Sequence, residues 1–229
     1  MVKGTSRSAG LDAGTVSAAL LMTITWGSSA VATKVGLASY GPGQVTLLRF
    51  IITGSLMVLY AILTRMRLPA RSDILPIIGL GLIGISITQL GFSFGITSVD
   101  PGTATFLIST VPVMTAILAR FWLGEQLSLA GWLGIGLTVI GTVVLVLGQG
   151  EGLAFTRGAV LLLFGAFSEA LYFILQKPFL RRYTSQEVST WALITASVPL
   201  VIFLPPLPAQ FQAAAPGDTA AVIYAAVGA

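Results

Sequence analysis

The side chains that could do chemistry in this chain are few, and the sharpest is a single acid inside an apolar run. Glu169 is the twelfth residue of the 23-residue run Gly158–Leu180. If the run is a helix, Gly165, Glu169, Tyr172 and Gln176 share one face, because their spacing follows the helical period. A carboxyl there can take up and release a proton, so we predict that Glu169 is a proton-binding group, with Tyr172 and Gln176 beside it. The alternative is a permanently protonated glutamate bonded to a neighbouring helix, or one that a fixed cation neutralises.

Two cations, Lys34 and Arg49, occur within neighbouring apolar runs. Lys34 is three residues from the end of Thr15–Leu37 and Arg49 is the sixth residue of Gln44–Thr64, so helices would bring them to matching depths. Their charges would attract an anionic or zwitterionic substrate. The alternative is that both side chains extend to the lipid–water interface. The sequence favours neither interpretation for Lys34, and favours a substrate or carbonyl contact for the deeper Arg49.

Uncharged polar residues complete the set of predicted substrate- or proton-binding residues: Trp26, Gln89, Ser93 and Ser109. Trp26 and Gln89 are too bulky for tight helix packing, which favours a place on a cavity wall. A serine in an apolar helix is more typical of a hydrogen bond between helices. Beside Gln89, a stripe of small residues would let another backbone approach closely: Gly84, Thr88, Gly91 and Gly95.

The chain contains no Cys and no His. This excludes a disulfide framework, a thiolate nucleophile and nearly every zinc or non-haem iron site, so we expect no metal and no cofactor. An intramembrane enzyme would need a nucleophile–base pair, and the apolar runs offer one acid and no G-x-S-x-G motif. No G-x-x-x-x-G-K-[ST] loop is present, so ATP cannot drive a process from this chain.

The apolar runs have the length of membrane spans. Ile74–Val99, Gln126–Gly150 and Val188–Gly217 hold no charged residue, and each exceeds the ~20 residues that cross a ~30 Å hydrocarbon core. Charged residues make up 9% of the chain and hydrophobic residues 55%, whereas soluble domains are ~25% charged. The expected fold class is therefore all-α, a polytopic membrane helix bundle.

The runs predict seven complete helices and the start of an eighth near Thr219. The expected bounds are Thr15–Leu37, Gln44–Thr64, Ile74–Thr97, Gly102–Leu123, Leu129–Leu147, Gly158–Leu180 and Val188–Leu204. Pro112 would permit a kink in the fourth helix, because a proline leaves one carbonyl without its backbone hydrogen bond. The short basic N-terminus and the long apolar run after it are typical of a signal anchor.

The basic residues between the runs predict the orientation. With a cytoplasmic N-terminus, only Arg157 lies outside, and the inside carries Lys3, Arg7, Arg65, Arg67, Arg71, Arg120, Arg181 and Arg182. This distribution fits the positive-inside rule, and the opposite orientation violates it. The net charge of +4 is spread over loops rather than gathered in one patch, which argues against nucleic acid as a partner.

An internal repeat emerges when the sequence is shifted by 143 residues, which lays the sixth run on the first and Glu169 on Trp26. Identities are few, and the order of the runs and the loop lengths support the repeat better. A unit of five helices is odd in number, so the second copy would be inverted, as in many transporters. We therefore expect two units, residues 1–150 and 151–229. The second unit would be truncated, because Ala229 maps onto the middle of the third helix of the first.

Several motifs resemble those of EamA-type carriers of the drug/metabolite transporter superfamily. Ala104–Glu125 resembles the family's fourth-span signature, and Gly131–Gly148 resembles its fifth span. Trp26-Gly27 with Lys34, and Arg49-Phe50, are similar to its opening motif. The resemblance implies ten helices in two inverted halves and export of small metabolites or drugs, often in exchange for protons. The sequence departs from that pattern in its missing C-terminal portion, and in Ala192 where the second half would repeat Arg49.

The expected function is secondary-active export of a small metabolite, an amino acid or a drug-like compound by proton exchange. The resemblance implies a multi-pass protein of a bacterial inner membrane, and the N-terminus would be cytoplasmic. The partners would be a small-molecule substrate and the lipid bilayer; the oligomeric state stays open, with a homodimer among the options. The alternative is a non-transporting, truncated or regulatory membrane protein derived from such a carrier.

Overall fold

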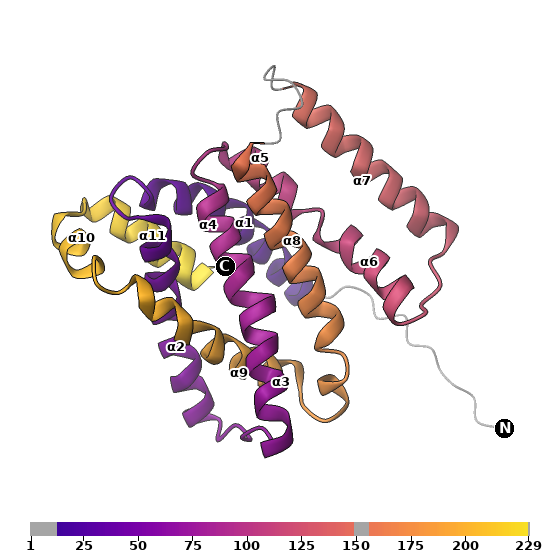
Figure 1. The fold of residues 1–229 in the computed structure, drawn as a ribbon, viewed down its shortest axis with the longest axis horizontal. Coiled ribbons are helices and arrows are strands. Elements are labelled where there is room, and N and C mark those ends of the chain that lie inside the picture. Colours follow the sequence, from indigo (N-terminus) through magenta and orange to yellow (C-terminus); the bar gives the residue numbers. More distant parts are fainter. Residues whose placement is uncertain (1–12, 149–155, 229) are drawn as a thin grey trace.

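The computed structural model describes residues 13–148 and 156–228, and every regular element in them is a helix (Figure 1). The first part forms α1 Ala13–Gly36, α2 Pro42–Leu63, α3 Arg71–Gly81, η1 Leu82–Ser86, α4 Ile87–Gly95, α5 Pro101–Ile108, α6 Val111–Trp122 and α7 Leu129–Gly148. The second part forms α8 Arg157–Leu175, η2 Phe179–Arg181, α9 Ser185–Ser197, η3 Val198–Phe203, α10 Leu207–Ala213 and α11 Pro216–Gly228. The all-α class predicted from the sequence is confirmed for these residues.

Five helical segments of the described residues are long and apolar enough to cross a membrane: Pro42–Leu63, Arg71–Gly95, Pro101–Trp122, Arg157–Arg181 and Ser185–Phe203. Each begins within three residues of a start predicted from the sequence. α1 and α7 fall on the first and fifth predicted helices. Lys3 and Arg7, which enter the orientation argument, lie outside the described residues. The sequence did not indicate α10, and α11 begins three residues before the predicted start at Thr219.

The third and fourth spans are interrupted within their length. A π-helical turn, η1, lies between α3 and α4 in the third span, and reasoning from the sequence did not predict it. The fourth span divides into α5 and α6 at Ser109 and Thr110, next to Pro112. The kink predicted from this proline is confirmed, because its ring cannot donate the backbone hydrogen bond that a continuous helix needs.

α4 and α8 pack closely in the bundle (Figure 1), and glycines on both helices bring their backbones together. A Cβ added to Gly91 would lie 2.8 Å from the carbonyl oxygen of Leu161, and one added to Gly165 would lie 3.1 Å from that of Thr88. The Thr88 hydroxyl also donates to the Gly165 carbonyl oxygen at 3.0 Å. The predicted role of the small-residue stripe, close approach of another backbone, is confirmed.

Polar contacts tie the loops together at each end of the bundle. At one end, the buried Asp73 carboxylate accepts hydrogen bonds from Arg182 at 3.0 Å and from Tyr183 at 2.8 Å. At the other end, the hydroxyls of Tyr40 and Thr219 lie 2.7 Å apart. The loop between α2 and α3 therefore shares one end with the loop between α8 and α9, and the basic residues of both loops lie on the same side.

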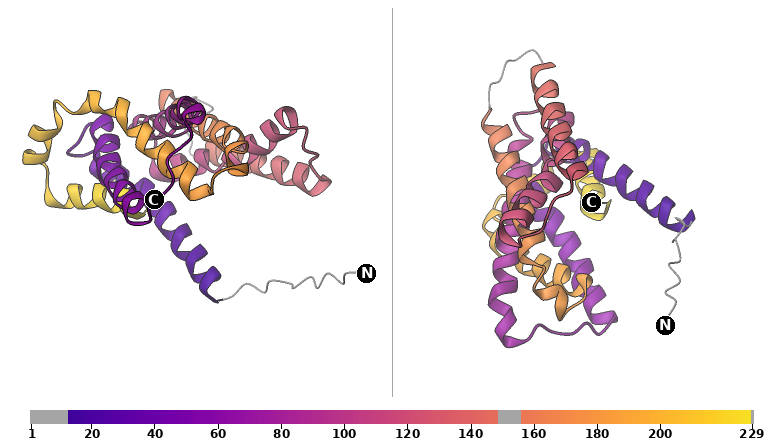
Figure 2. Two further views of the ribbon diagram at one scale, coloured as in Figure 1. Left: turned by 90° about the horizontal axis from the view of Figure 1, so that it is seen from below. Right: turned by 90° about the vertical axis from the view of Figure 1, so that its right-hand side faces the viewer.

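α7 lies to one side of the bundle and approaches it chiefly along α5 (Figures 1 and 2). Leu133, Leu137 and Ile140 on this helix are strongly exposed. Such side chains suit lipid contact in a membrane, so α7 adds little to the polar interior that the other helices surround.

Candidate functional site

Arg49 is a cation buried within a membrane span. It lies on α2 and is 7% exposed, yet the hydrogen bond that its guanidinium makes within the described residues is a long one, from Nη1 to Gln89 Oε1 of α4 at 3.3 Å. The ion pairs of the described residues involve other cations, Lys177 with Glu125 and Arg182 with Asp73. Arg49 therefore carries a buried charge that no described acid neutralises.

Two successive links between α2 and α4 hold Arg49 in place. Thr46, one turn before Arg49 on α2, donates to the hydroxyl of Ser93 at 2.8 Å. Ser93 is fully buried and lies one turn beyond Gln89 on α4. Because both links run between the same two helices, the guanidinium is positioned by the helix pair rather than by a mobile loop.

The geometry of the guanidinium decides what it can bind. An arginine has five N–H donors, and one long bond to a neutral amide leaves most of them unused. Burying the charge costs several kcal/mol unless a partner compensates it, as an order of magnitude. A carboxylate is the best geometric match, because it can accept two parallel N–H···O bonds. Arg49 and Gln89 are thus suited to hold the carboxylate of a small molecule.

Glu169 lies at the midpoint of the span Arg157–Arg181 and is half-buried. The preceding Ser168 is engaged, because its hydroxyl donates to the carbonyl oxygen of Ile83 in η1. No described residue donates a hydrogen bond to the Glu169 carboxyl or forms an ion pair with it. A charged residue at the bilayer centre costs ~2.5–3.5 kcal/mol on insertion scales. The carboxyl is therefore free to exchange a proton or to bind a ligand.

Arg49 and Glu169 are related through α4, against which both α2 and α8 pack. Gly165, one turn before Glu169, meets Thr88, which is the neighbour of Gln89. Glu169 therefore lies roughly one turn, ~5 Å along the helix axis, beyond the level of Gln89. The Arg49 and Glu169 side chains do not come within the 4.0 Å of an ion pair, so they do not neutralise each other.

Tyr172 and Gln176 are both buried on α8, on the face predicted from the sequence. Tyr172 packs against Gly84 of the π-helical turn, and its hydroxyl lies 3.1 Å from that of Ser189 in α9. It therefore connects α8 to both η1 and α9, one turn from Glu169. Turns of π-helix are frequent at functional sites, where they shift the register of one helix segment against the next.

The Lys34 ammonium group has a different environment, because it is bonded entirely to backbone. Nζ donates to the carbonyl oxygens of Ile96, Thr97 and Val99 at 2.6, 3.1 and 3.0 Å. These carbonyls lie just after α4, where a helix leaves its last acceptors without internal partners and where positive charge is favourable. Of the two interpretations left open for Lys34, neither describes this carbonyl contact, which uses all three ammonium hydrogens.

The other predicted residues lie apart from Arg49. Trp26 is 55% exposed on α1. Ser109 is exposed at the break between α5 and α6, and its hydroxyl donates to the carbonyl oxygen of Phe106 at 2.6 Å. The predicted set is therefore not one cluster. Arg49, Gln89 and Ser93 form a group between α2 and α4, while Tyr172, Gln176 and Glu169 lie along α8.

Two features of the interior were missed by reasoning from the sequence. One is η1, whose Ile83 and Gly84 carbonyl oxygens accept the hydroxyls of Ser168 and Thr88. The small, hydroxyl-bearing residues around it were the available signal. The other is buried Asp73, whose partners lie 109 and 110 residues away, so no local pattern could have found them.

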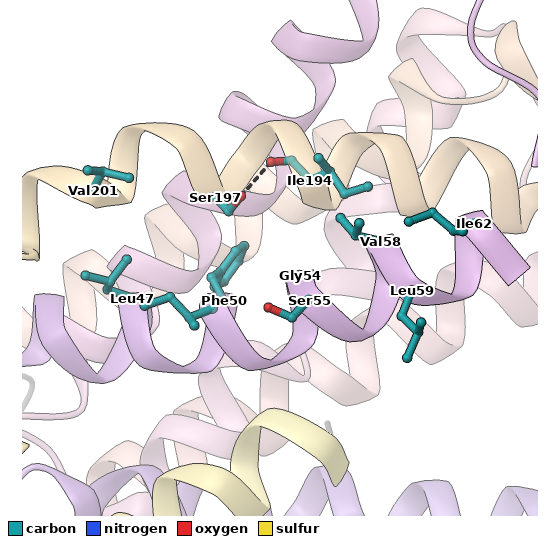
Figure 3. Close-up of a pocket in the computed structure, with 11 residues that line it drawn as sticks. Leu47, Phe50, Gly54, Ser55, Val58, Leu59, Ile62, Ile194, Ser197 and Val201 are labelled. Carbon is teal, nitrogen blue, oxygen red and sulfur yellow. Dashed lines mark hydrogen bonds between the residues drawn. The ribbon is translucent and has the colours of Figure 1, made fainter.

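A groove of about 530 Å³ runs between α2 and α9 (Figure 3). Its wall is mostly apolar, with Leu47, Phe50 and Val58 from α2 facing Ile194 from α9 and Val201 from η3. A second hollow of about 500 Å³ lies between α1 and α5 and includes the predicted Ser109. Neither hollow is lined by Arg49 or Glu169, so both hollows are separate from these two charged residues.

Comparison with known proteins gives sequence matches along most of the chain. The EamA-like transporter family model matches residues 14–147. YdfC, an uncharacterised transporter of Bacillus subtilis, is 30% identical over 204 residues, which are 89% of this chain and 67% of YdfC. A probable terminal-alkyne amino-acid exporter of Streptantibioticus cattleyicolor is 32% identical over 208 residues, which are 90% of this chain and 69% of that protein.

A shorter match and a solved structure complete the comparison. YedA, an uncharacterised inner membrane transporter of Escherichia coli K12, is 28% identical over 152 residues, or 64% of this chain and 48% of YedA. A crystal structure superposes with a TM-score of 0.64 over 90% of this chain and 71% of that chain, at 22% identity, which supports the fold alone. The chain spans about two thirds of the length of its first two relatives.

Proposed function

The chain belongs to the EamA-like transporter family, which consists of membrane transporters rather than enzymes, and on this premise we propose that it exports a small molecule in exchange for protons. The substrates would be amino acids, other small metabolites or drug-like compounds. Glu169 would be the proton-binding group, and Arg49 with Gln89 would hold a substrate carboxylate.

One observation carries the proposal: two opposite charges lie inside the bundle, and neither has an ion-pair partner among the described residues. Arg49 is buried on α2, and Glu169 is half-buried at the midpoint of its span. Intramembrane ionisable groups are costly, and they mark substrate paths and proton relays in membrane proteins. A ligand that carries both charges would compensate both groups at once.

Exchange follows if proton and substrate compete for Glu169. A zwitterionic substrate would place its carboxylate on Arg49 and Gln89 and its ammonium group on ionised Glu169. On the acidic side of the membrane a proton would bind the carboxylate, remove the partner of the ammonium group and weaken substrate binding. The protonated carrier would return and release that proton on the other side, so that one proton enters for each substrate exported.

The membrane topology and the repeat belong to the same proposal. The loops that carry Arg65, Arg67, Arg71, Arg181 and Arg182 would face the cytoplasm, which puts the N-terminus there. YedA is named as an inner membrane transporter, which supports that location for this chain. Residues 1–150 and 151–229 would be two inverted units, with α8 repeating α1, and the substrate path would lie between them.

The first test of the proposal is an efflux screen with the twenty common amino acids as the probe panel. Vesicles containing the protein would be loaded with the panel, and the compounds released under an inward proton gradient would be identified by mass spectrometry. We expect release of one or a few amino acids above protein-free vesicles. Amino-acid transport is supported by the relative named as an amino-acid exporter, and a panel that is wholly retained would contradict this substrate class.

The second test concerns the proton and uses Glu169→Gln. This change keeps the size of the side chain and removes its ability to ionise, so efflux should no longer accelerate when the proton gradient is imposed. Glu125→Gln is the matched control, because Glu125 is exposed and its pair with Lys177 is of the surface kind that is worth little. Gradient-driven efflux that is the same in Glu169→Gln as in the unmodified protein would refute the coupling role.

A further inference from the structure

The apolar groove between α2 and α9 continues to the end of the membrane span. A smaller hollow of about 350 Å³ shares Val58, Ile62 and Ile194 with this groove, so the two are continuous. The smaller hollow adds Arg65 and Trp191 to the lining. We call this continuous surface, lined from Leu47 on α2 to Arg65 just beyond the end of α2 and by facing residues of α9 and η3, the α2–α9 groove. Figure 3 shows its part from Leu47 to Ile62.

Arg65 occupies a backbone position that usually belongs to glycine. Its φ is 49°, the one positive φ of a non-glycine residue in the described chain. Arg65 N donates to the Ile62 carbonyl oxygen at 3.1 Å and Met66 N donates to that of Ala61 at 2.9 Å, which is the hydrogen-bond pattern of a Schellman motif at the end of α2. A side chain at this left-handed position is strained, and strain of this kind tends to persist at ligand-binding positions.

The geometry and the charge fit one kind of occupant: we infer that the α2–α9 groove binds an anionic phospholipid. Its acyl chain would lie along the apolar wall, and its phosphate would meet the Arg65 guanidinium. Gly54 lies eleven residues before Arg65, or about 17 Å at the helical rise, which is about one leaflet of a hydrocarbon core ~30 Å thick. The groove continues beyond Gly54 to Leu47, so it is long enough to hold an acyl chain that starts at Arg65.

Charge and aromatic placement support the choice of an anionic headgroup. Arg65 lines the hollow just beyond the end of α2, and a basic residue close to the membrane surface attracts anionic lipids. The indole N–H of Trp191 donates to the Arg67 carbonyl oxygen at 2.9 Å. This contact places an aromatic ring with a polar edge at the end of the span, as in the aromatic belts of membrane proteins. The site does not depend on the transport function proposed above.

Two variants test the site without disturbing the fold. Arg65→Gly removes the guanidinium and gives the left-handed position the residue that suits it, so the variant should fold at least as well. Gly54→Leu puts a bulky side chain into the groove about one leaflet from Arg65, at a position where an added Cβ meets no atom within 4 Å. Arg67→Gln is the matched control, because it removes one positive charge from the same loop and Arg67 does not line the groove.

The purified protein would be incubated with equal amounts of phosphatidylglycerol and phosphatidylcholine that share the same acyl chains, and retained lipid would be counted by native mass spectrometry. We expect at least fivefold preference for phosphatidylglycerol, its loss in Arg65→Gly, loss of the bound lipid in Gly54→Leu, and its retention in Arg67→Gln. If Gly54→Leu failed to fold, Arg65→Gly would decide the question alone.

Three results would overturn the inference. Equal retention of both lipids would show that the headgroup charge is not recognised. Displacement of the lipid by millimolar glycerol phosphate would assign the site to a free phosphate compound rather than a membrane lipid. A dimer in lipid-free detergent that Gly54→Leu converts to a monomer would assign the groove to a second copy of the chain.

Discussion

Lys34 and Arg49 approach α4 from two neighbouring helices, and their environments are opposite. Lys34 reaches the end of α4 from α1, and its three hydrogens all bond to carbonyl oxygens of Ile96, Thr97 and Val99. Arg49 reaches the same span from α2, about two turns before its end, and finds the amide oxygen of Gln89 at 3.3 Å. One cation completes the structure around it, and the other is left with most of its donors unused.

The difference shows that the partners of an intramembrane cation, rather than its depth, distinguish a structural role from ligand binding. A cation that fills a helix end compensates its own burial, so a ligand gains nothing by approaching it. A buried guanidinium with one weak bond lacks that compensation. It would gain from a carboxylate that arrives with a substrate, and Arg49 is therefore the better candidate for substrate binding.

The largest expected effect is that of Arg49→Gln on transport. Removing one partner of a buried, hydrogen-bonded charge pair costs about 2 kcal/mol or more, which corresponds to about a 30-fold or greater loss of affinity for a carboxylate-bearing substrate. Thermal stability should hardly fall, because the side chain contributes one long bond to the fold. Transport kinetics and thermal unfolding in detergent would be measured on the same preparation.

Arg157→Gln provides the control for Arg49→Gln, because Arg157 is an exposed arginine at the start of α8. It should leave affinity unchanged. If Arg49→Gln instead unfolded the protein and left the affinity of the surviving fraction intact, Arg49 would be a structural cation like Lys34. The contrast between the two would then disappear.

Lys34→Met should give the converse result. The apolar side chain keeps most of the volume and leaves three carbonyl oxygens without their donor, at a cost of about 1–3 kcal/mol of folding stability. Transport per folded molecule should change little. Lys177→Met is the control, since its exposed pair with Glu125 should be worth less than about 1 kcal/mol. Unchanged stability in Lys34→Met, together with a loss of substrate affinity, would reverse the two assignments.

The sequence predicted the helices that carry Lys34 and Arg49 and several features of their packing. Apolar runs of membrane length mark the spans because every backbone polar group in lipid must be satisfied within a helix. Pro112 marked the break in the fourth span, and Gly91 and Gly95 marked the close contact between α4 and α8. These features depend on local chemistry, which a single sequence contains.

What a single sequence could not supply is the partner of each polar group. Lys34 and Arg49 have equivalent positions in their runs, and only the packed structure shows that one meets carbonyls 62 to 65 residues away. Asp73 reads as an ordinary first-turn acid until Arg182 and Tyr183 are brought to it. The π-helical turn likewise meets distant partners, because Ser168 of α8 donates to the Ile83 carbonyl oxygen and Tyr172 packs against Gly84.

The smallest expected effect, and the finest test of the contrast, is that of Gln89→Leu. This variant removes the one described bond of the Arg49 guanidinium and leaves the charge in place. A neutral partner is worth about 1 kcal/mol, so affinity for the substrate should fall roughly fivefold. Ser86→Ala is the control one turn away: it breaks the buried bond to the Ala196 carbonyl oxygen and should lower stability by a similar amount without changing affinity.

The decisive measurement is the combination of Gln89→Leu with Arg49→Gln. If Gln89 acts by orienting the guanidinium toward a carboxylate, the loss should not add, because residues that share one partner couple in a double-mutant cycle. The double variant should then bind substrate no more weakly than Arg49→Gln alone. Full additivity would mean that Gln89 contacts the substrate by itself, and a fall in stability without a fall in affinity would make the Arg49–Gln89 bond a structural link, like that between Lys34 and the end of α4.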